Sequence, residues 1–224
     1  KLSADKLGSI VIKEILRKNK LDKDDIDEVI MGQVLTAGGG QNPARQAAIN
    51  AGINISKPAH LINQVCGSGL RAVISGYQSI KLGEVKNVIS GGQENMSLAP
   101  HSIFYRDDKK ISEKLLIDTM INDGLIDAFN NYHMGVTAEN VAKKFNISRV
   151  DQDDFALNSQ KKTEIAINTN RFEEEIIKIN QPGINLDIDE HPRKKLTKLD
   201  LEKLKAVFLK DGTVTPGNSS GIND

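Results

Sequence analysis

Residues 60–82 read HLINQVCGSGLRAVISGYQSIKL, and this stretch decides the fold. The first part, from His60 to Val65, is short and mostly apolar, which predicts a strand. From Gly67 to Leu82, apolar residues recur on one stripe at helical spacing: Leu70, Val73, Ile74, Tyr77 and Ile80. The sequence therefore predicts a strand that turns directly into a helix, with Cys66 at the junction.

The same alternation of helix and strand surrounds this stretch. Apolar spacing predicts a helix from Ser3 to Lys20, and a compact apolar segment predicts a buried strand within Ile26 to Leu35. A second helix is expected between Asn42, as its cap, and Gly52. Residues 87–90 predict a third strand that ends before Gly91-Gly92. Such alternation indicates an α/β fold, with a mixed, mostly parallel sheet and covering helices.

The alternation fails from Glu94 to about Gly135, where Asp123-Gly124 and scattered charges predict an irregular insertion. Beyond it, Thr137 and Ser148 are expected to cap two helices, the second through a capping box. Residues 171–203 are dense in charge, and we predict strands that cross a solvated surface there.

Composition excludes several classes of function. Thirty basic and thirty acidic residues cancel, so no overall field draws in nucleic acid or an anionic membrane. No apolar run approaches the ~20 residues that cross a bilayer, so we expect no membrane partner. A single cysteine excludes an internal disulfide and is compatible with a cytoplasmic location. The four histidines lie far apart, which disfavours a metal site.

Cys66 is the candidate nucleophile because it precedes a glycine-rich helix start. A helix N-terminus carries free amides and a partial positive charge, which favour thiolate over thiol. Gly67 and Gly69 leave room for a bulky electrophile, and their amides can hydrogen-bond a developing oxyanion. A thiolate that attacks a thioester forms another thioester, so the position suits acyl transfer. On position alone, Cys66 could equally be a small apolar residue buried between strand and helix.

The glycine clusters have another interpretation, as phosphate-binding loops. Neither Gly38-Gly39-Gly40 nor Gly67-Ser68-Gly69 forms a P-loop with its Lys-Ser/Thr end, and neither completes the spaced dinucleotide fingerprint. Flexible turns explain both clusters more simply.

The segment Asn63-Gln64-Val65-Cys66-Gly67-Ser68-Gly69-Leu70-Arg71-Ala72 resembles the nucleophile segment of the thiolase family. Further segments are similar, in order and spacing, to biosynthetic-type thiolases: 32–35, 41–46, 90–97, 123–125, 132–135, 137–142 and 212–215. The resemblance implies an N-terminal thiolase domain in residues 1–97, with its first strand absent. It also implies an inserted α+β loop domain that covers CoA in residues 98–214, and the return to the N-terminal domain in residues 215–224.

The resemblance also implies a reaction. Cys66 would take an acetyl group from acetyl-CoA, and the carbanion of a second acetyl-CoA would attack it, giving acetoacetyl-CoA and CoA. Thiolytic cleavage is the reverse. No cofactor is implied, because CoA is part of the substrate. Ketoacyl synthases share a cysteine at a helix start, but Tyr132-His133-Met134-Gly135 fits thiolases better. The non-catalytic alternative is a CoA-binding or oligomerisation module in which Cys66 is inert.

Four further residues match substrate positions of the family. Leu125, His133 and Met134 match positions that line the pantetheine and acyl site, and Met134 would favour short acyl chains. Lys205 matches a place where relatives often put a basic residue near the adenine nucleotide. The alternatives are ordinary packing for Leu125 and Met134, a structural or surface role for His133, and one charge on a solvated helix for Lys205.

Residues 97–119 resemble the loop through which these enzymes join dimers into tetramers, so we expect a homo-oligomer, a dimer of dimers. Thiolases also use a histidine that activates the nucleophile and a second cysteine, both in a C-terminal half of the same topology. None of the four histidines here occupies that motif, and the chain has one cysteine. We therefore expect an inactive fragment, truncated at both ends.

Overall fold

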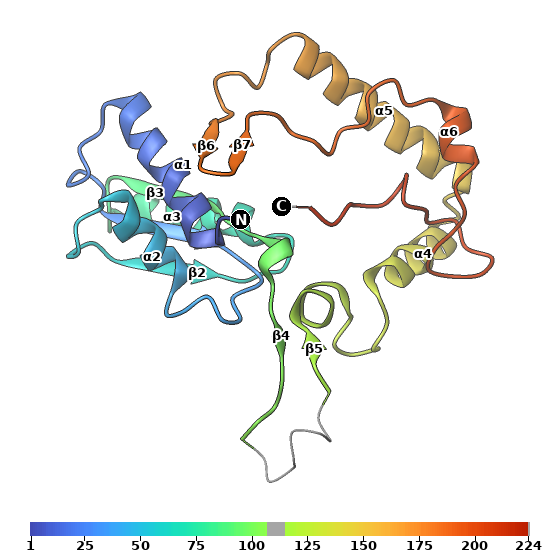
Figure 1. Cartoon of the computed structure of the whole chain (residues 1–224), viewed down its shortest axis with the longest axis horizontal. Coiled ribbons are helices and arrows are strands. Elements are labelled where there is room, and N and C mark those ends of the chain that lie inside the picture. The colour runs from blue at the N-terminus through green and yellow to red at the C-terminus, as the bar shows by residue number, and fades with distance from the viewer. Residues whose placement is uncertain (107–114, 224) are drawn as a thin grey trace. The chain divides into compact units, whose positions relative to one another are not determined.

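The structure is a computed structural model that describes residues 1–106 and 115–223. It divides into two compact units, Lys1–Gly124 and Leu125–Asn223, which are described separately below. Figure 1 shows the elements of both units in chain order. The domain boundary expected at residue 97 rests on the family resemblance and stays a prediction. Within the described ranges, no helix has the length and apolar character that crossing a membrane requires.

The first unit is a parallel sheet with helices in the predicted alternation. Its elements are α1 (Ala4–Asn19), β1 (Glu28–Gly32), α2 (Pro43–Ala51), β2 (Ala59–Ile62), α3 (Ser68–Lys81) and β3 (Val88–Gly92). The strand order is β2-β1-β3, and both pairs are parallel. The α/β prediction is therefore confirmed. The expected end of the third strand before Gly91 is wrong, because Gly91 and Gly92 pair with Met31 and Gly32 of β1.

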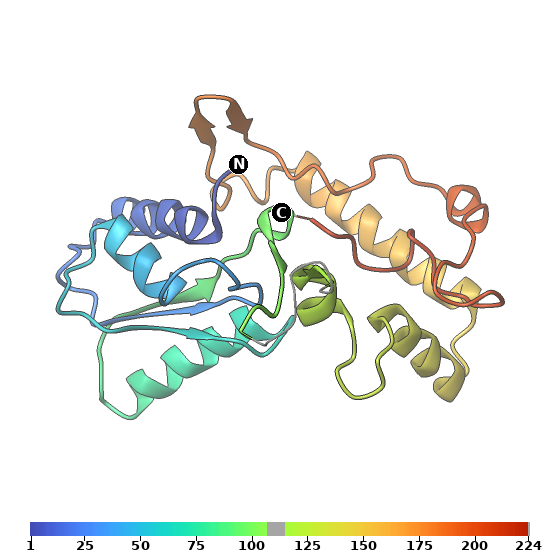
Figure 2. The same ribbon diagram turned by 60° about the horizontal axis from the view of Figure 1, so that its bottom comes forward.

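The core of the first unit lies under α1 and α2, which cover one face of the sheet (Figure 2). Ile12 and Leu16 of α1 pack with Val29 of β1 and with the alanines of α2 in one buried cluster. Ala47 is fully buried, and small side chains of this kind allow two helices to approach closely. Burial of this apolar face follows directly from the helical spacing of the sequence.

Helix α3 covers the opposite face of the sheet (Figure 2) and is packed differently. Its buried residues are the small Ser68, Ala72 and Gly76. The apolar stripe that predicted this helix is exposed in the described structure, including Leu70 and Tyr77. The periodicity therefore identified the helix correctly, but its apolar stripe is not the face that packs on the sheet.

Short elements follow β3, as the predicted irregular insertion requires. They are the 3-10 helix η1 (Met96–Leu98), β4 (His101–Ser102), β5 (Ile117–Asp118) and the π-helical turn η3 (Met120–Leu125). Strands β4 and β5 pair antiparallel. Part of the expected tetramerisation loop, residues 107–114, lies outside the described residues.

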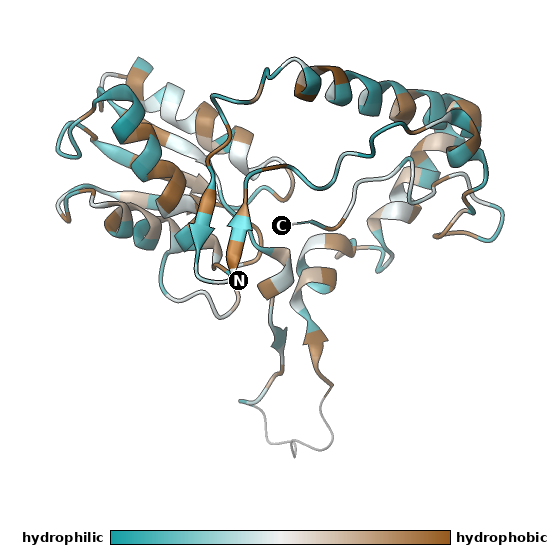
Figure 3. Ribbon diagram, turned by 45° about the horizontal axis from the view of Figure 1, so that its top comes forward, coloured by the Kyte–Doolittle hydropathy of each residue, from teal (hydrophilic) through white to brown (hydrophobic). Residues whose placement is uncertain are grey.

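The second unit is built from two longer helices and a hairpin. Its elements are α4 (Met134–Phe145), α5 (Arg149–Asn168), β6 (Ile179–Gln181), β7 (Ile184–Leu186) and α6 (Lys198–Glu202). Figure 3 shows α5 as mostly hydrophilic, with single hydrophobic residues scattered along it. Strands β6 and β7 pair antiparallel across Pro182-Gly183, where Gly183 takes a φ of +78°. This hairpin confirms strands within residues 171–203.

The caps of α4 and α5 test two predictions. The capping box at Ser148 is confirmed, because Ser148 Oγ accepts the Asp151 amide and the Asp151 carboxylate accepts the Ser148 amide. The predicted cap at Thr137 is wrong. Helix α4 starts three residues earlier, at Met134, and the side chain of His133 accepts the Gly135 amide as its cap. Thr137 lies inside the first turns of the helix.

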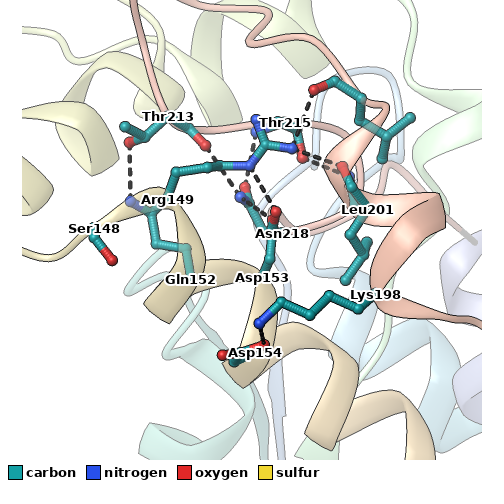
Figure 4. A network of polar contacts seen from close by, with 12 residues as sticks. Ser148, Arg149, Gln152, Asp153, Asp154, Lys198, Leu201, Thr213, Thr215 and Asn218 are labelled. Atoms are coloured by element: carbon teal, nitrogen blue, oxygen red, sulfur yellow. Dashed lines mark hydrogen bonds and ion pairs between the residues drawn. The ribbon is translucent and has the colours of Figure 1, made fainter.

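Polar side chains hold the middle of the second unit together (Figure 4). Asp153 of α5 is 2% exposed; it accepts hydrogen bonds from Arg149 Nε at 2.7 Å and from Asn218 Nδ2 at 2.9 Å. The guanidinium of Arg149 also donates to the carbonyl oxygens of Leu201 and Leu204, at 2.6 and 3.1 Å. These contacts join α5 to α6 and to the C-terminal segment.

A second buried carboxylate belongs to α4. Glu139 accepts the amides of Thr213 and Val214, each at 2.8 Å at its nearest oxygen, and the Thr213 hydroxyl at 2.9 Å. Gln152 of α5 donates to the same hydroxyl at 2.9 Å (Figure 4). Segment 212–215, one of the family-like motifs, is thus fixed by both long helices.

Candidate active site

Cys66 lies in a strained turn between β2 and α3. Val65, directly before it, has a φ of +49°. A β-branched residue rarely adopts this left-handed conformation, and such a residue costs of order 1–3 kcal/mol. Asn63 Oδ1 accepts the Val65 amide at 3.0 Å, which supports the turn from its strand side. Strain of this kind persists only where the surrounding structure holds it, and it concentrates at functional sites.

Ser68 supplies the rest of that support. Its hydroxyl accepts the Gln64 amide at 2.9 Å and donates to the Val65 carbonyl oxygen at 2.6 Å. The side chain is buried, so these bonds are shielded from water. Ser68 therefore holds the backbone before and after the strained Val65 by hydrogen bonds. These bonds fix the path of the chain into Cys66.

The backbone amides at the helix start are only partly available. Gly67 donates to the Gln64 carbonyl oxygen at 3.1 Å, and Ser68 donates to the Val65 carbonyl oxygen at 3.0 Å. The expectation that the Gly67 amide can bind an oxyanion is therefore wrong in this conformation. Within residues 1–106 and 115–223, the amide of Gly69 has no hydrogen-bond acceptor, as expected in the first turn of a helix. Gly69 remains the candidate donor.

A glycine of β1 sets how closely the helix start approaches the sheet. A Cβ on Gly32 would lie 2.3 Å from the carbonyl carbon of Ser68 and 2.5 Å from the amide nitrogen of Gly69. Only glycine allows backbone-to-backbone contact at this distance. Local sequence spacing does not reveal this role, although Gly32 opens one of the family-like segments. Gly32 therefore positions the first turn of α3 and, with it, Cys66.

The exposure of Cys66 decides between its two interpretations. The residue is a free, exposed cysteine, so it is not an apolar residue buried between strand and helix. An exposed thiol that precedes a helix N-terminus is accessible to an electrophile. The chemistry that this junction supports is attack of sulfur on an acyl carbon, with the Gly69 amide as a hydrogen-bond donor nearby in sequence.

Glu94 is a further polar group at the carboxyl end of the sheet, where parallel strands commonly place ligand sites. Its carboxylate accepts the Val34 amide at 2.8 Å and the Leu35 amide at 3.3 Å. Burial raises the pKa of this half-buried carboxyl above its usual range, against the lowering effect of the hydrogen bonds from Val34, Leu35 and Asn95. Glu94 joins the ends of β1 and β3 and was not singled out from the sequence.

The other expected site residues belong to the second unit, and three of them surround one short loop. An antiparallel bridge pairs Ile126 with His133, which places Leu125 and Met134 at the two ends of this loop. Leu125 is half-buried and Met134 is 37% exposed. Neither side chain belongs to the buried core. Their contact with substrate stays a prediction.

His133 is held on two sides. Its Nδ1 accepts the Gly135 amide at 3.0 Å, and its ring stacks on Phe208 with 4.8 Å between centroids and 23° between planes. A structural role, one of the alternatives for this residue, is therefore real, because His133 caps α4. The contact with Phe208 was missed, since nothing in the spacing of residues 205–210 marks this aromatic residue.

Lys205 is exposed and lies in irregular chain after α6. The alternative that placed it on a solvated helix is wrong in that respect. Its expected position near an adenine nucleotide stays a prediction. Among residues 1–106 and 115–223, no three His, Cys, Asp or Glu side chains gather closely enough to hold a metal ion.

Comparisons with known proteins point to one family. The family model described as "Thiolase, N-terminal domain" matches residues 1–224. The acetyl-CoA acetyltransferase of Pseudomonas aeruginosa is 50% identical over 229 residues, with all of this chain and 58% of the relative covered. The cytosolic acetyl-CoA acetyltransferase of Rattus norvegicus is 49% identical over 224 residues, with 97% of this chain and 56% of the relative covered.

A solved structure agrees with this. The crystal structure of the Bacillus anthracis acetyl-CoA acetyltransferase matches with a TM-score of 0.92 at 33% identity, and covers all of this chain and 58% of that protein. The chain thus spans somewhat more than half of the length of the relatives it matches. Because a thiolase family model matches every residue, the chain belongs to the thiolase family, in its N-terminal domain.

Proposed function

We propose that this chain carries the nucleophile of an acetyl-CoA C-acetyltransferase, which condenses two acetyl-CoA to acetoacetyl-CoA and CoA or runs the thiolytic reverse. The observation that carries the proposal is the exposed Cys66 in the strained turn ahead of α3. Relatives named acetyl-CoA acetyltransferase, about 50% identical, support the choice of reaction.

The first half of the reaction transfers the acetyl group to sulfur. Cys66 Sγ loses its proton to a base and attacks the carbonyl carbon of acetyl-CoA. The carbonyl oxygen becomes an oxyanion, which the Gly69 amide would stabilise. The bond from carbon to the CoA sulfur then breaks, and the departing thiolate takes up a proton. The products are acetyl-Cys66 and free CoA.

The second half forms a carbon–carbon bond. A base removes a proton from the methyl group of a second acetyl-CoA, and the carbanion attacks the acyl carbon on Cys66. The bond from that carbon to Sγ breaks, and Cys66 recovers its proton as acetoacetyl-CoA forms. The family resemblance assigns the base chemistry to a histidine and a second cysteine. The only cysteine in these 224 residues is the nucleophile itself.

Substrate binding is proposed for the second unit. Leu125, His133 and Met134 surround the loop 126–133 and would contact the pantetheine arm and the acyl group. Lys205, an exposed cation, would lie near the adenine nucleotide. These residues fall within the proposed CoA-covering domain of residues 98–214.

Self-association is proposed through residues 97–119. In the described part of this segment, Phe104, Leu115 and Leu116 are 76%, 85% and 66% exposed. Exposed apolar side chains beside a pair of short strands commonly mark an interface. A homotetramer built as a dimer of dimers is the proposed assembly. A cytoplasmic location is proposed as well, supported by the cytosolic name of the rat relative and by the single cysteine.

The test is direct detection of the acyl-enzyme. The intact protein is mixed with isotope-labelled acetyl-CoA, quenched in acid and digested, and the peptide that contains Cys66 is analysed by tandem mass spectrometry. We expect one labelled acetyl group on Cys66, which free CoA or neutral hydroxylamine removes. Cys66→Ala should abolish the label and leave CoA affinity unchanged.

A matched control on the same helix is Gln78→Ala, which alters an exposed side chain away from the junction and should retain the label. If the intact wild-type protein binds CoA but never forms the thioester, Cys66 is inert, and the CoA-binding or oligomerisation alternative replaces the enzyme.

A further inference from the structure

One peptide group at the end of β1 is bonded to both neighbouring strands. The carbonyl oxygen of Gly32 accepts the amide of Gln93, which follows β3 directly, at 2.9 Å. The amide of Gln33, in the same peptide group, donates to the carbonyl oxygen of Ile62 at 3.1 Å. Ile62 is the last residue of β2, and β2 leads into the strained turn. This peptide group therefore holds the strand side of the turn that carries Cys66.

Gly32 also holds the helix side of that turn, because its Cα lies against the backbone of Ser68 and Gly69. Gly92, its partner in β3, lies beside the same helix start: a Cβ on Gly92 would be 3.5 Å from the Cα of Gly69. The ends of β1 and β3 thus form the surface on which the first turn of α3 rests. A shift of the peptide group between Gly32 and Gln33 would therefore move the chain on both sides of the nucleophile.

The side chains of Gln33 and Gln93 lie on the opposite face of the sheet. Successive residues of a strand point to opposite faces, so these glutamines face α1 while the glycines before them face α3. Figure 2 shows α1 and α3 on the two faces. The contacts agree, since a Cβ on Gly8 of α1 would overlap with Oε1 of Gln93. Both glutamines are buried, at 4% and 7% exposure. Their influence on the proposed nucleophile can therefore pass only through the backbone.

A directed chain of hydrogen bonds fixes both side chains. Nε2 of Gln33 donates to the carbonyl oxygen of Leu35 at 2.8 Å, so Gln33 turns its Oε1 toward Gln93, whose Nε2 donates to it at 2.9 Å. Oε1 of Gln93 is then turned toward Gly8 and, within residues 1–106 and 115–223, has no hydrogen-bond partner. A buried acceptor without a partner is unfavourable and calls for an explanation. The bond from Gln93 to Gln33 supplies one.

We propose that Gln33 is a positioning residue for Cys66. Its side chain is held by Leu35 and Gln93 on one face of the sheet, and it fixes the orientation of the peptide group between Gly32 and Gln33. That peptide group holds the end of β2 and the start of α3, and so fixes the place from which the sulfur of Cys66 attacks. This inference rests on the proposed function for the reaction, whereas the place of the sulfur does not depend on the acyl donor.

The main test is Gln33→Met, which removes both side-chain hydrogen bonds and keeps an unbranched side chain of similar length. In the intact protein, we expect the rate constant of Cys66 acetylation at saturating acetyl-CoA to fall about tenfold, since small misplacements of a reacting atom are costly. The acetyl-CoA concentration that gives half of the maximal rate should stay within about twofold, because Gln33 is separated from the substrate by the sheet. Quenched-flow mixing, followed by mass spectrometry of the peptide that contains Cys66, measures both quantities.

Two further variants separate positioning from a general loss of stability. Ile12→Ala truncates a buried apolar residue one helical turn beyond Gly8 on α1, so it lowers stability and leaves the chain of hydrogen bonds intact. At a temperature where every variant is folded, its acetylation rate should equal that of the wild type. Gln93→Met removes only the bond to Oε1 of Gln33 and should lower the rate less than Gln33→Met does. It also keeps the test open should Gln33→Met fail to fold.

Alkylation of Cys66 by iodoacetamide distinguishes this inference from the proposed function, because it requires no acyl donor. Its rate at fixed pH should also fall in Gln33→Met. Wild-type rates of both reactions in a folded Gln33→Met variant, or an equal loss in Ile12→Ala, would overturn the positioning role. An unchanged maximal rate with a raised half-saturating concentration would overturn it as well. If Gln33→Met slows alkylation but the wild type is never acetylated, the proposed function fails and the positioning of the sulfur is supported.

Discussion

The two units of the chain are stabilised by different kinds of interior. In the first unit, the most buried large side chains are apolar, such as Ile12, Ile26 and Ile30 at 1% exposure or less. In the second unit, Asp153 and Thr215 are as buried as Leu201, at 2%, 0% and 0%. Apolar packing is non-directional and tolerates small shifts, whereas a buried carboxylate requires each donor in place. The second unit should therefore be more sensitive to single polar substitutions.

The largest effect is expected from Glu139→Ala. This change leaves the Thr213 and Val214 amides and the Thr213 hydroxyl without their acceptor, and breaking a buried polar network of this kind costs about 3–5 kcal/mol. Hydrogen–deuterium exchange should rise at residues 212–215 and stay unchanged in β1. The control is Glu190→Ala, which removes an exposed carboxylate. If residues 212–215 exchange at the same rate in both variants, Glu139 does not hold this segment. The proposed difference between the interiors of the two units would then fail.

Next in size is Ile12→Ala, which tests the apolar interior. Ile12 is 1% exposed, and truncation of such a side chain costs about 2–4 kcal/mol because it leaves a cavity. Chemical unfolding measures the loss, and exchange should increase in α1 and β1. The matched control is the neighbouring Val11→Ala, since Val11 is 45% exposed and should change stability little. Similar losses for the two variants would show that the α1 face is not packed as described.

Gly32→Ala should reduce function more than stability. The added Cβ would meet the backbone of Ser68 and Gly69, so α3 must shift at a cost of about 1–3 kcal/mol. The rate of Cys66 acetylation should fall at least tenfold, because small misplacements of a reacting group are costly. Gly91→Ala is the control: a Cβ there meets no atom within 4 Å, and the rate should be unchanged.

The smallest effect concerns pH. Burial raises the pKa of Glu94 in the folded state above its usual value of 4.5, so the folded protein binds more protons than the unfolded chain just above that pH. Below pH 4.5, protonated Glu94 therefore contributes its full share to the free energy of unfolding. This contribution is lost as the pH rises from 4.5 through the raised pKa and Glu94 ionises. Glu94→Gln removes this titration. The difference in unfolding free energy between the wild type and the variant should fall as the pH rises across this window. A difference that stays constant with pH would contradict the raised pKa.

The same contrast explains what could be predicted from sequence. Periodicity located α1 and α3, because apolar residues recur with the period of a helix. The cap residues Asn42 and Gly52 located α2, and the alternation of helix and strand predicted the parallel sheet. The place of Cys66 at the helix start was predictable because the cysteine, the glycines and the helix start are adjacent in the chain. Partners distant in sequence left no local signal, as with Glu139 and Thr213 or Gly32 and Ser68. Thr137 was chosen as a cap by residue type, whereas tertiary contacts selected His133.

The unusual backbone of Val65 has a consequence for engineering. Its left-handed conformation with a β-branched side chain stores conformational energy next to the proposed nucleophile. A library selected only for heat resistance should therefore enrich glycine or asparagine at this position, since both relax that energy. The same substitutions loosen the turn that aims Cys66. Selection for robustness and selection for turnover are thus expected to choose different residues at position 65.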